Sequence, residues 1–432
     1  MQDEGNGAQQ PLWKANLDVN IWLVQTSEPV PVNDSIRKMR TALLADKLVE
    51  GGHSVVWWTS AFDHFRKEWL SNDDAEAEPV SGLRIVAVKG IGYSKNVSMR
   101  RFVDYRIVAR KFRKMASGMP RPDVIVASMP HDILYEAVMF AKRQEIPAIA
   151  DIRDRWPDTL LDPFPGRLLR SVARMVLSRD FAMVGEALRA ADGLVAATDS
   201  FLRWGMGHAG RDKTWKDRVF FHGYKKLEKS EEGSIGAQLR RRLEPLRGKF
   251  VVLFIGTISD SYHNPLLLLR AAERLTEDEN THFVIAGDGE LLPRLEEEAQ
   301  GVANVTLTGW LNKDEIEYAM DKASVGVCPA TRETDVPTNK FFSYLSAGLP
   351  VVSAFQGDTR DITESRHAGL YYPPNDVDAF VEHVRTLRGN QTLCKEMSEN
   401  ARRVFSDMFD ADKIYEEYAG HVVKVAERAR RQ

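Results

Sequence analysis

Two turns in the second half of the sequence have the composition of an anion-binding site. The first turn contains Gly256 and Thr257, and the second contains Gly287, Asp288 and Gly289. Each follows a short apolar run that is typical of a buried strand. Glycine lets the backbone approach a ligand closely, and a helix that begins after such a turn presents unpaired N–H groups to phosphate. Either turn alone also fits an ordinary tight turn, but the pair at strand ends of one domain favours an anion site.

A helix start lies further along the same half of the chain. Thr338 is a good N-cap residue, and Asn339 and Lys340 fill the first predicted turn. The positive end of the helix macrodipole and the ammonium of Lys340 would act together on an anion. The sequence therefore predicts that this helix N-terminus contributes to the same site as the glycine turns.

Polar side chains also follow the apolar runs of the first half. His131 comes after the run 123–127, Glu28 and Asn33 lie in the loop after the first run, and Asp154 lies between two arginines after a later run. Open α/β sheets place their sites at the carboxyl ends of strands, so these four residues are candidates for ligand binding. The alternatives are a solvated loop histidine at 131, ordinary loop residues at 28 and 33, and an internal ion-pair lattice around Asp154.

Apolar runs alternate with segments of helical periodicity, and this alternation predicts β-α-β units with parallel strands. The predicted strands of the first half are 19–24, 54–58, 83–88, 123–127, 147–151, 193–197 and 218–221. Those of the second half are 250–255, 282–286, 305–307, 325–328, 350–353 and 370–372. The fold class predicted is α/β, with two Rossmann-like, doubly wound domains that face each other across a cleft.

A highly charged stretch with few large apolar residues separates the two series of strands and marks a domain boundary. We expect a flexible tail over 1–16, a first domain over 17–225, a linker and first helix over 226–247, a second domain over 248–405, and a C-terminal helix over 406–432. The last segment is amphipathic and charged, so it can pack back on the N-terminal domain.

Composition narrows the class of protein. The chain has 432 residues and a net charge of −3, whereas a polyanion binder is usually strongly basic, so nucleic acid is not an expected partner. The two cysteines, Cys328 and Cys394, lack a metal or redox spacing and fit a reducing compartment. The sequence shows neither a secretory signal nor an apolar run of about 20 residues that could span a bilayer. These features predict a cytoplasmic protein.

One stretch of the first half is basic and amphipathic. Arg100–Arg121 contains eight basic residues interleaved with apolar ones, and 167–179 repeats this composition. Such a pattern is typical of helices on anionic membrane surfaces. It also fits a helix that packs on the core and leaves a basic face in solvent. We expect the first of these, which would place the protein at the periphery of the inner membrane face.

Several longer motifs carry a resemblance to a known family. They are 287–289, 304–310 and 337–352 in the second half, and 52–55 and 151–157 in the first. Together they resemble the family 4 glycosyltransferases, which are retaining enzymes of the GT-B fold, of the kind found in bacterial surface polysaccharide synthesis. The resemblance covers nearly the whole chain.

The resemblance implies that a nucleoside diphosphate sugar binds the C-terminal domain and that a glycan or lipid-linked saccharide acceptor binds mainly the N-terminal one. It implies transfer with retention, and neither a metal nor another cofactor. The expected catalytic residues are Asp335 and His131, and the expected acceptor-binding residues are Glu28, Asn33 and Asp154. The expected donor-binding residues are Gly256, Thr257, Ser259, Tyr262, Gly287, Asp288, Gly289, Trp310, Thr338, Asn339, Lys340 and Ser343.

The chain departs from the family at two places. The family usually carries two glutamates eight positions apart, and here Asp335 and Ser343 stand at the matching positions. The family's basic pair after the first glycine turn is also missing, and Lys340 is among the nearest basic residues. Two alternatives therefore stay open: a sugar-nucleotide epimerase of GT-B fold, and a degenerate transferase that serves as a non-catalytic binding subunit.

Overall fold

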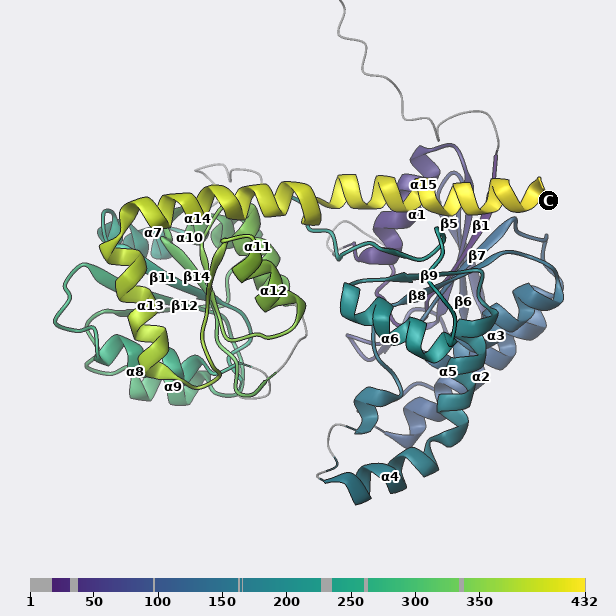
Figure 1. Cartoon of the computed structure of the whole chain (residues 1–432), viewed down its shortest axis with the longest axis horizontal. Helices are drawn as coiled ribbons and strands as arrows, with labels where there is room; N and C mark the ends of the chain where they lie inside the picture. The colour runs from purple at the N-terminus through teal and green to yellow at the C-terminus, as the bar shows by residue number, and fades with distance from the viewer. Residues whose placement is uncertain are drawn as a thin grey trace, which may run out of the picture. The chain divides into compact units, whose positions relative to one another are not determined.

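The computed structural model divides the chain into two compact units (Figure 1). The described residues are 18–31, 38–95, 98–161, 164, 166–226, 235–259, 263–333 and 338–431. The N-terminal unit takes the described residues up to Gly223 together with those from Asp412 onwards, and the C-terminal unit is Tyr224–Ala411.

The N-terminal unit is built on a sheet with the strand order β10-β9-β8-β7-β1-β2-β6-β5, in which β5 is antiparallel to β6 and the other pairs are parallel. The strands are β1 (Asn20–Val24), β2 (Ser54–Ser60), β5 (Ala75–Val80), β6 (Leu83–Val88), β7 (Val124–Ser128), β8 (Ala148–Ile152), β9 (Gly193–Ala196) and β10 (Arg218–Val219), with a small hairpin of β3 (Phe62–Asp63) and β4 (Glu68–Trp69) beside them. The order reverses between β1 and β7. Ligands bind at such a switch point in open α/β sheets.

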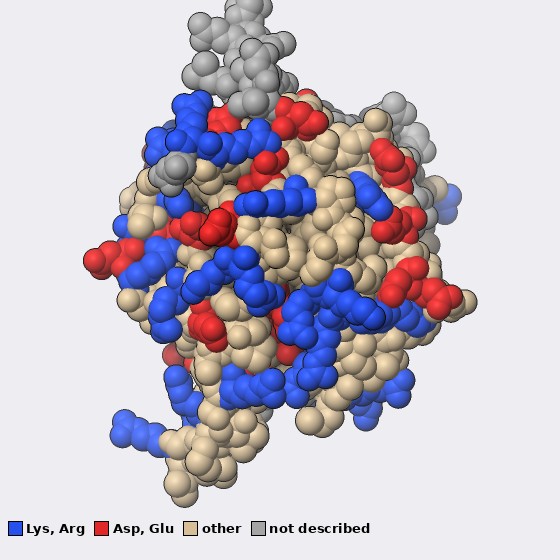
Figure 2. Space-filling view, turned by 90° about the vertical axis from the view of Figure 1, so that its right-hand side faces the viewer, with Lys and Arg blue, Asp and Glu red and all other residues tan. Residues whose placement is uncertain are grey.

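Helices cover both faces of this sheet, which is why its central strands are continuous apolar runs. On one face Trp22, Trp58 and Phe112 pack edge to face, with ring centroids 5.3 Å apart for the two tryptophans and 4.9 Å apart for Trp58 and Phe112. The helices are α1 (Arg40–Glu50), α2 (Met99–Ala116), α3 (His131–Arg143), α4 (Arg167–Val176), α5 (Ser178–Ala190), α6 (Asp199–Ala209) and α15 (Ala411–Arg430), with a 3₁₀ turn η2 (Asp158–Leu161). Figure 2 shows Lys and Arg side chains gathered across the middle and lower part of the face that is turned to the viewer.

The C-terminal helix α15 belongs to the N-terminal unit. Tyr418 stacks on Phe220 at 4.6 Å between ring centroids, and His421 Nε2 lies 3.1 Å from the carbonyl oxygen of Lys216. Arg430 pairs with Asp123 at the far end of the helix. The predicted return of the C-terminal helix to the N-terminal domain is therefore confirmed.

The C-terminal unit has a second parallel sheet, with the order β13-β12-β11-β14-β15-β16 and a switch point between β11 and β14. Its strands are β11 (Phe250–Ile255), β12 (Thr281–Ala286), β13 (Val305–Gly309), β14 (Val325–Cys328), β15 (Val351–Ser353) and β16 (Gly369–Tyr371). Its helices are α7 (Ala237–Leu243), α8 (Pro265–Glu273), α9 (Leu292–Glu298), α10 (Lys313–Lys322), α11 (Asn339–Ala347), α12 (Asp358–Ser365), α13 (Val377–Gly389) and α14 (Gln391–Val404), with a 3₁₀ turn η4 (Glu244–Leu246) and a π turn η5 (Phe405–Phe409). Two Rossmann-like domains with parallel sheets confirm the predicted fold class.

A buried lattice of ion pairs lies at the carboxyl edge of the N-terminal sheet. Arg40 and Asp151 are fully buried, and their closest contact joins Nη2 to Oδ1 at 3.0 Å. Arg40 also donates to the carbonyl oxygen of Phe220 at 2.5 Å. Arg153 pairs with both Asp151 and Glu28. The two guanidinium groups hold the pKa of Asp151 at about 2 against the opposing effect of burial.

We expect Asp151→Asn to lower the free energy of unfolding by about 3–5 kcal/mol, because it leaves the buried Arg40 without its carboxylate and leaves Arg153 with Glu28 alone. Urea unfolding at pH 7 measures the loss. Asp46→Asn is the control, since Asp46 makes an exposed pair with Lys38 at 2.7 Å and its loss should cost less than about 1 kcal/mol. The folded-state pKa of Asp151 lies below its unfolded value, so its contribution is complete above about pH 4 and declines as the pH falls towards 2. Equal losses in the two variants would contradict the prediction.

Candidate functional site

The two glycine turns meet at the carboxyl edge of the C-terminal sheet, beside its switch point. Gly256 follows β11 with φ +152°, and Gly287 follows β12 with φ +148°. The N–H of Gly256 donates to the carbonyl oxygen of Ala286 at 2.9 Å. A Cβ on Gly287 would lie 1.8 Å from the carbonyl oxygen of Gly256, so a larger residue would push the turns apart. The glycines are therefore needed for one backbone surface made by both turns.

Lys340 lies directly over this surface. It is the second residue of α11, and only 8% of it is exposed. Its Nζ lies 2.8 Å from where a Cβ on Gly256 would stand, 2.8 Å from Nε2 of His263 and 4.7 Å from the ring centroid of Phe254. Burial lowers the pKa of Lys340 to about 8. At neutral pH the site therefore holds a mostly protonated, desolvated cation beside the glycine backbone.

His263 is the neutral partner of that cation. Burial, together with the charge of Lys340, lowers the pKa of His263 to about 4, so the imidazole is uncharged at pH 7. Its Nδ1 lies 3.2 Å from the carbonyl oxygen of Pro329. A carbonyl only accepts, so Nδ1 carries the proton and Nε2 is free to accept from the ammonium. Nothing in the sequence signals the contact of His263 with Lys340, which lies 77 positions away.

The other expected donor residues lie at or near the same edge. Trp310 follows β13 and is 72% exposed, and Asp288 accepts from the N–H of Gly289 at 2.7 Å. Ser343 is buried, and its hydroxyl donates to the carbonyl oxygen of Asn339 at 3.1 Å within α11. Thr257 and Ser259 lie in the first glycine turn, and Thr338 precedes α11. Tyr262, Asp335 and, in the N-terminal domain, Asn33 lie outside the described residues. The roles assigned to all of them stay predictions.

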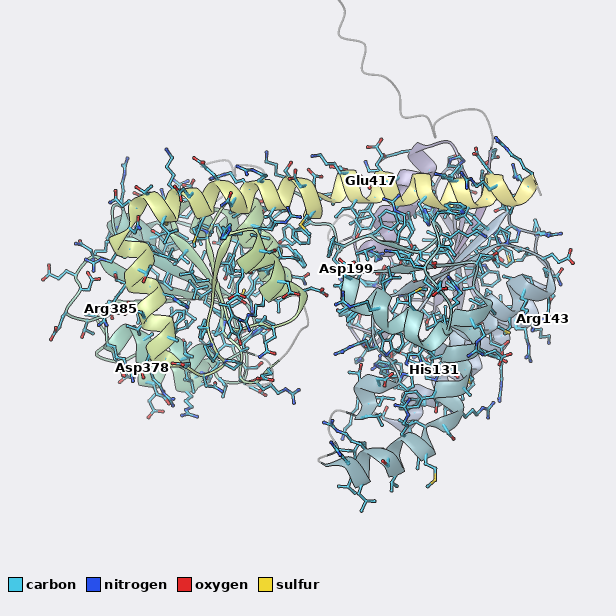
Figure 3. All side chains as sticks on the ribbon, in the orientation of Figure 1. His131, Arg143, Asp199, Asp378, Arg385 and Glu417 are labelled. Atoms are coloured by element: carbon cyan, nitrogen blue, oxygen red, sulfur yellow. The ribbon has the colours of Figure 1, made fainter. Side chains whose placement is uncertain are left out.

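In the N-terminal unit, His131 begins α3 at the end of β7 and is fully buried (Figure 3). Its Nε2 lies 2.9 Å from Oδ1 of Asp180 and 3.5 Å from Oδ2 of Asp132. Arg106 adds a cation on the same two carboxylates. The spacing in the sequence placed His131 at a strand end, but it gave no signal for Asp180, 49 positions further on. A catalytic role for His131 stays a prediction, and in this structure its ring is held by carboxylates.

The two described acceptor candidates also have partners in the chain. Glu28 accepts from the N–H of Thr41 at 2.8 Å and pairs with Arg153, so both of its oxygens are engaged. Asp154 accepts from the hydroxyl of Thr159 at 3.1 Å, and burial raises its pKa. Acceptor binding stays a prediction for both.

The basic stretch 100–121 forms α2 and the loop after it. Its apolar side packs on the core through Tyr105, Val108 and Phe112. Three ion pairs on its other side are Arg106–Asp180 at 3.5 Å, Lys111–Asp74 at 2.6 Å and Arg113–Glu136 at 3.4 Å. Part of the positive charge of α2 is thus balanced within the unit, and membrane contact by this helix stays a prediction. Among the described residues, no helix joins the length and apolar character needed to cross a membrane.

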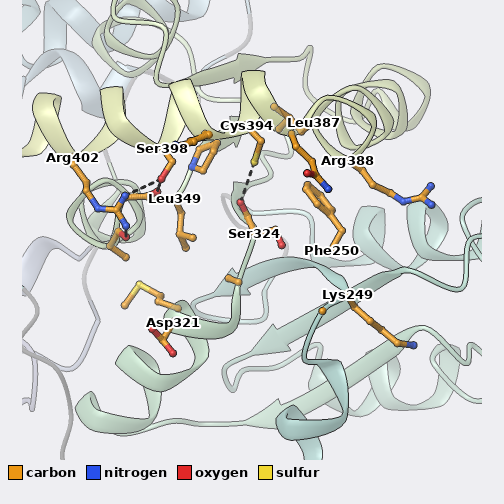
Figure 4. A pocket seen from close by; sticks show the side chains of 18 of the residues that line it. Lys249, Phe250, Asp321, Ser324, Leu349, Leu387, Arg388, Cys394, Ser398 and Arg402 are labelled. Carbon is orange, nitrogen blue, oxygen red and sulfur yellow. Dashed lines mark hydrogen bonds between the residues drawn. The ribbon is translucent and has the colours of Figure 1, made fainter.

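A hollow of about 720 Å³ lies at the other edge of the C-terminal sheet (Figure 4). Lys249 and Phe250 at the start of β11 line it, as do Cys394, Ser398 and Arg402 of α14. The hydroxyl of Ser398 accepts from Arg402 at 2.9 Å. This edge carries the amino ends of the strands, where neither the glycine turns nor Lys340 reach. The hollow is therefore not part of the candidate site.

Solved structures share this fold. The crystal structure of HepE from Anabaena in complex with UDP aligns with 93% of this chain and 98% of its own, at a TM-score of 0.63 and 15% identity. An E. coli trehalose-6-phosphate structure bound with UDP-2-fluoro glucose aligns with 94% of this chain and 99% of its own, at a TM-score of 0.67 and 11% identity. The chain has the GT-B fold, with two Rossmann-like domains.

Within that class, the family model described as Glycosyl transferases group 1 matches residues 249–390, so the C-terminal unit carries a domain of this family. The O-antigen chain mannosyltransferase C of Escherichia coli is 33% identical over 171 residues, which are 38% of this chain and 44% of that protein. The Campylobacter jejuni GalNAc-alpha-(1->4)-GalNAc-alpha-(1->3)-diNAcBac-PP-undecaprenol alpha-1,4-N-acetyl-D-galactosaminyltransferase is 28% identical over 178 residues, which are 40% and 48%. The matched part spans somewhat less than half the length of these relatives.

We expect Lys340→Met to raise the free energy of unfolding at pH 7 by roughly 1–3 kcal/mol, because it removes a desolvated ammonium and keeps the apolar stem. The folded-state pKa of about 8 lies below the unfolded value near 10.4, so the unfolded chain binds more protons between these values. The wild-type protein therefore gains stability over this range, and its deficit relative to Lys340→Met shrinks. Urea unfolding at pH 7 and at about pH 10 measures both differences.

The control for this prediction is Lys313→Met on α10, where the lysine side chain is 74% exposed. This exchange should change the free energy of unfolding by less than about 0.5 kcal/mol at either pH. If the free energy of unfolding of the wild-type protein lay below that of Lys340→Met by the same amount at both pH values, the desolvation of Lys340 would be contradicted.

Proposed function

We propose that the protein is a glycosyltransferase that moves a sugar from a nucleoside diphosphate sugar to a hydroxyl of a glycan or lipid-linked saccharide, with retention of the anomeric configuration. The observation that carries the proposal is the buried Lys340 over the two glycine turns. Among the described residues no carboxylate pairs with it, and its near neighbours are the neutral imidazole of His263 and the ring of Phe254. A diphosphate would supply the missing negative charge.

The chemistry that these groups can perform is stabilisation of a leaving group. When the bond from the anomeric carbon to the diphosphate oxygen breaks, negative charge grows on the diphosphate. In the proposed pose, the buried ammonium of Lys340 and the N-terminus of α11 would lie beside the place where that charge develops and would stabilise it. The same cation and dipole support the proposal that the diphosphate is neutralised without a metal ion or cofactor. Asp335 is proposed to face the positive charge that develops on the sugar.

The names of the relatives support the acceptor class. One relative is a mannosyltransferase of O-antigen chains, and the other is named for a saccharide on undecaprenol diphosphate. We propose that this chain likewise extends a glycan or a lipid-linked saccharide in the cytoplasm, at the inner face of the plasma membrane. The basic residues of Arg100–Arg121 that lack an internal partner would add attraction to anionic lipid.

The decisive experiment starts from the purified full chain and a panel of nucleoside diphosphate sugars. A thermal-shift screen identifies the donor, because a ligand that binds only the folded state raises the melting temperature. Turnover is then followed on that donor. Slow hydrolysis or transfer supports the proposal. Conversion of the free sugar nucleotide to its epimer would instead show an epimerase, and binding without turnover would show a non-catalytic subunit.

We expect donor affinity to fall as the pH rises above about 8, because Lys340 must be protonated to pair with the diphosphate. Lys340→Met should weaken donor binding about 10- to 100-fold at pH 7, the effect of one hydrogen bond to a charged group, and should remove this pH dependence. Isothermal titration at pH 7 and pH 9 measures both. Donor affinity that is unchanged in Lys340→Met would place the diphosphate elsewhere.

We expect Asp335→Asn to lower kcat far more than donor affinity, since a contact made only in the transition state changes the rate alone. The measurement is initial-rate kinetics together with the donor Kd. Asp288→Asn is the comparison variant. Asp288 accepts a hydrogen bond from the backbone N–H of Gly289 in its own turn, so its replacement is expected to change donor affinity more than kcat. Full turnover in Asp335→Asn would remove this residue from the proposed chemistry.

A further inference from the structure

Helix α4 in the N-terminal unit presents its apolar side chains to solvent. Leu168, Met175 and Val176 are 78%, 70% and 75% exposed, and Leu169 and Val172 are 50% and 47% exposed. Counted from Leu168, the other four lie one, four, seven and eight positions further on, which places all five on one face of the helix. A surface helix normally turns such a stripe to the core. In α4 the stripe faces outward.

The opposite side of α4 is the one that contacts the protein. Arg174 lies over the ring of Phe181 at 4.3 Å and 3.8 Å from the carboxylate of Asp158, and Ala173 is buried. Arg170 donates to the backbone carbonyl of Phe164 at 3.0 Å. The side of α4 that contacts the rest of the unit is therefore the arginine side, and the apolar stripe lies on the side that faces away from the unit.

The charge around the stripe identifies what would cover it. Residues 164–179 contain four arginines, at 167, 170, 174 and 179, and no acidic residue. In Figure 2 the tip of the unit that is formed by α4 carries uncharged and basic side chains, and basic side chains dominate the surface above it. An apolar stripe on a helix whose charged residues are all arginines matches the boundary between acyl chains and anionic headgroups. A protein partner would need a surface that is both apolar and strongly acidic.

We propose that α4 inserts its apolar face into the surface of an anionic lipid bilayer. Leu168, Val172 and Val176 enter the acyl region, and the arginines stay at the level of the phosphates, as long basic side chains do at such boundaries. The helix has 10 residues, which suits it to lie in the interface and not to span the bilayer. This assigns membrane contact to a different element from α2, whose apolar side is used by the core.

The inference deepens the membrane part of the proposed function. The segment from β8 to α4 contains Asp154 and η2, so α4 is connected through this stretch of chain to the carboxyl edge of the N-terminal sheet. A saccharide that protrudes from a lipid diphosphate would be within reach of this edge. Vesicle binding is measured without donor or acceptor, so its failure and the failure of the transferase proposal are separate results.

The first test is flotation of the full chain with vesicles of phosphatidylglycerol and phosphatidylcholine, compared with vesicles of phosphatidylcholine alone. The test variant is Leu168→Ser with Met175→Ser and Val176→Ser. These side chains are exposed, so the melting temperature should stay unchanged. We expect the variant to bind anionic vesicles at least about tenfold more weakly, because binding scales with the apolar area inserted. Val80→Ser is the matched control, since Val80 is 53% exposed on β5, and it should bind like the wild type.

Salt separates the two candidate elements. At about 0.5 M salt, where the Debye length is only a few ångströms, attraction by α2 is screened and insertion by α4 persists in part. Replacing Arg110 and Lys114 by Gln should therefore reduce binding at low salt and leave the residual binding at high salt unchanged. Loss of all binding in this α2 variant, with full binding in the α4 variant, would overturn the proposal.

A site-specific label tests insertion directly. Cys328 is buried, and burial raises the pKa of its thiol to about 12, so it will not react. In a Cys394→Ser background, Met175→Cys can therefore carry a single environment-sensitive fluorophore. Its emission should shift to the blue on addition of anionic vesicles, and the same label at Val80→Cys should not respond. No shift at position 175, or wild-type chains that pair through α4 in solution and ignore vesicles, would refute the inference.

Discussion

The fully buried pair of Arg40 and Asp151 fixes the carboxyl edge of the N-terminal sheet. Removing each ion from water costs several kcal/mol, so neither residue can occupy its place unless the other is there. Arg40 comes from α1, Asp151 from β8, and the guanidinium also lies 5.0 Å from the ring of Tyr418 in α15. Segments from both ends of the chain must therefore be in place together. This explains why the last helix belongs to the first domain.

The C-terminal unit uses a buried cation in the opposite way. Lys340 is as secluded as the arginines of the lattice, but among the described residues its partners are a neutral imidazole and an aromatic ring. The glycine turns at Gly256 and Gly287 pack closely together beside it, and their N–H groups donate to the carbonyl oxygens of Ala286 and Gly309. A cation balanced by a carboxylate holds a fold together, whereas one left without a counter-charge at a switch point costs stability and favours an anionic ligand. That contrast separates the structural lattice from the candidate site.

The sequence was sufficient for the features that depend on local pattern. Continuous apolar runs identified the strands other than β3, β4 and β5, which are short or exposed at the sheet edge and carry no such run, and the glycines after two of the apolar runs indicated the edge of the sheet where a site is proposed. It was insufficient where residues meet across long separations. Nothing in the sequence pairs Lys340 with His263, His131 with Asp180, or Glu28 with an arginine, because each contact depends on which strands become neighbours. Of the ion-pair lattice weighed for the segment around Asp154, the structure shows the pairs of Arg153 with Asp151 and Glu28, whereas Asp154 accepts from Thr159.

Helix α4 shows the same limit for apolar residues. Its sequence has the period of an ordinary amphipathic helix. Periodicity predicts which residues share a face of the helix, but it does not predict whether other parts of the protein cover that face. In the structure, Arg174 contacts Asp158 and Phe181 while Leu168 and Val176 lie in water. Exposed apolar side chains of this number carry a cost that burial in lipid would relieve. Lys340 thus lacks an anion, and the exposed stripe of α4 lacks an apolar cover. A sugar nucleotide would supply the anion, and the membrane that holds a lipid-linked acceptor would supply the acyl surface.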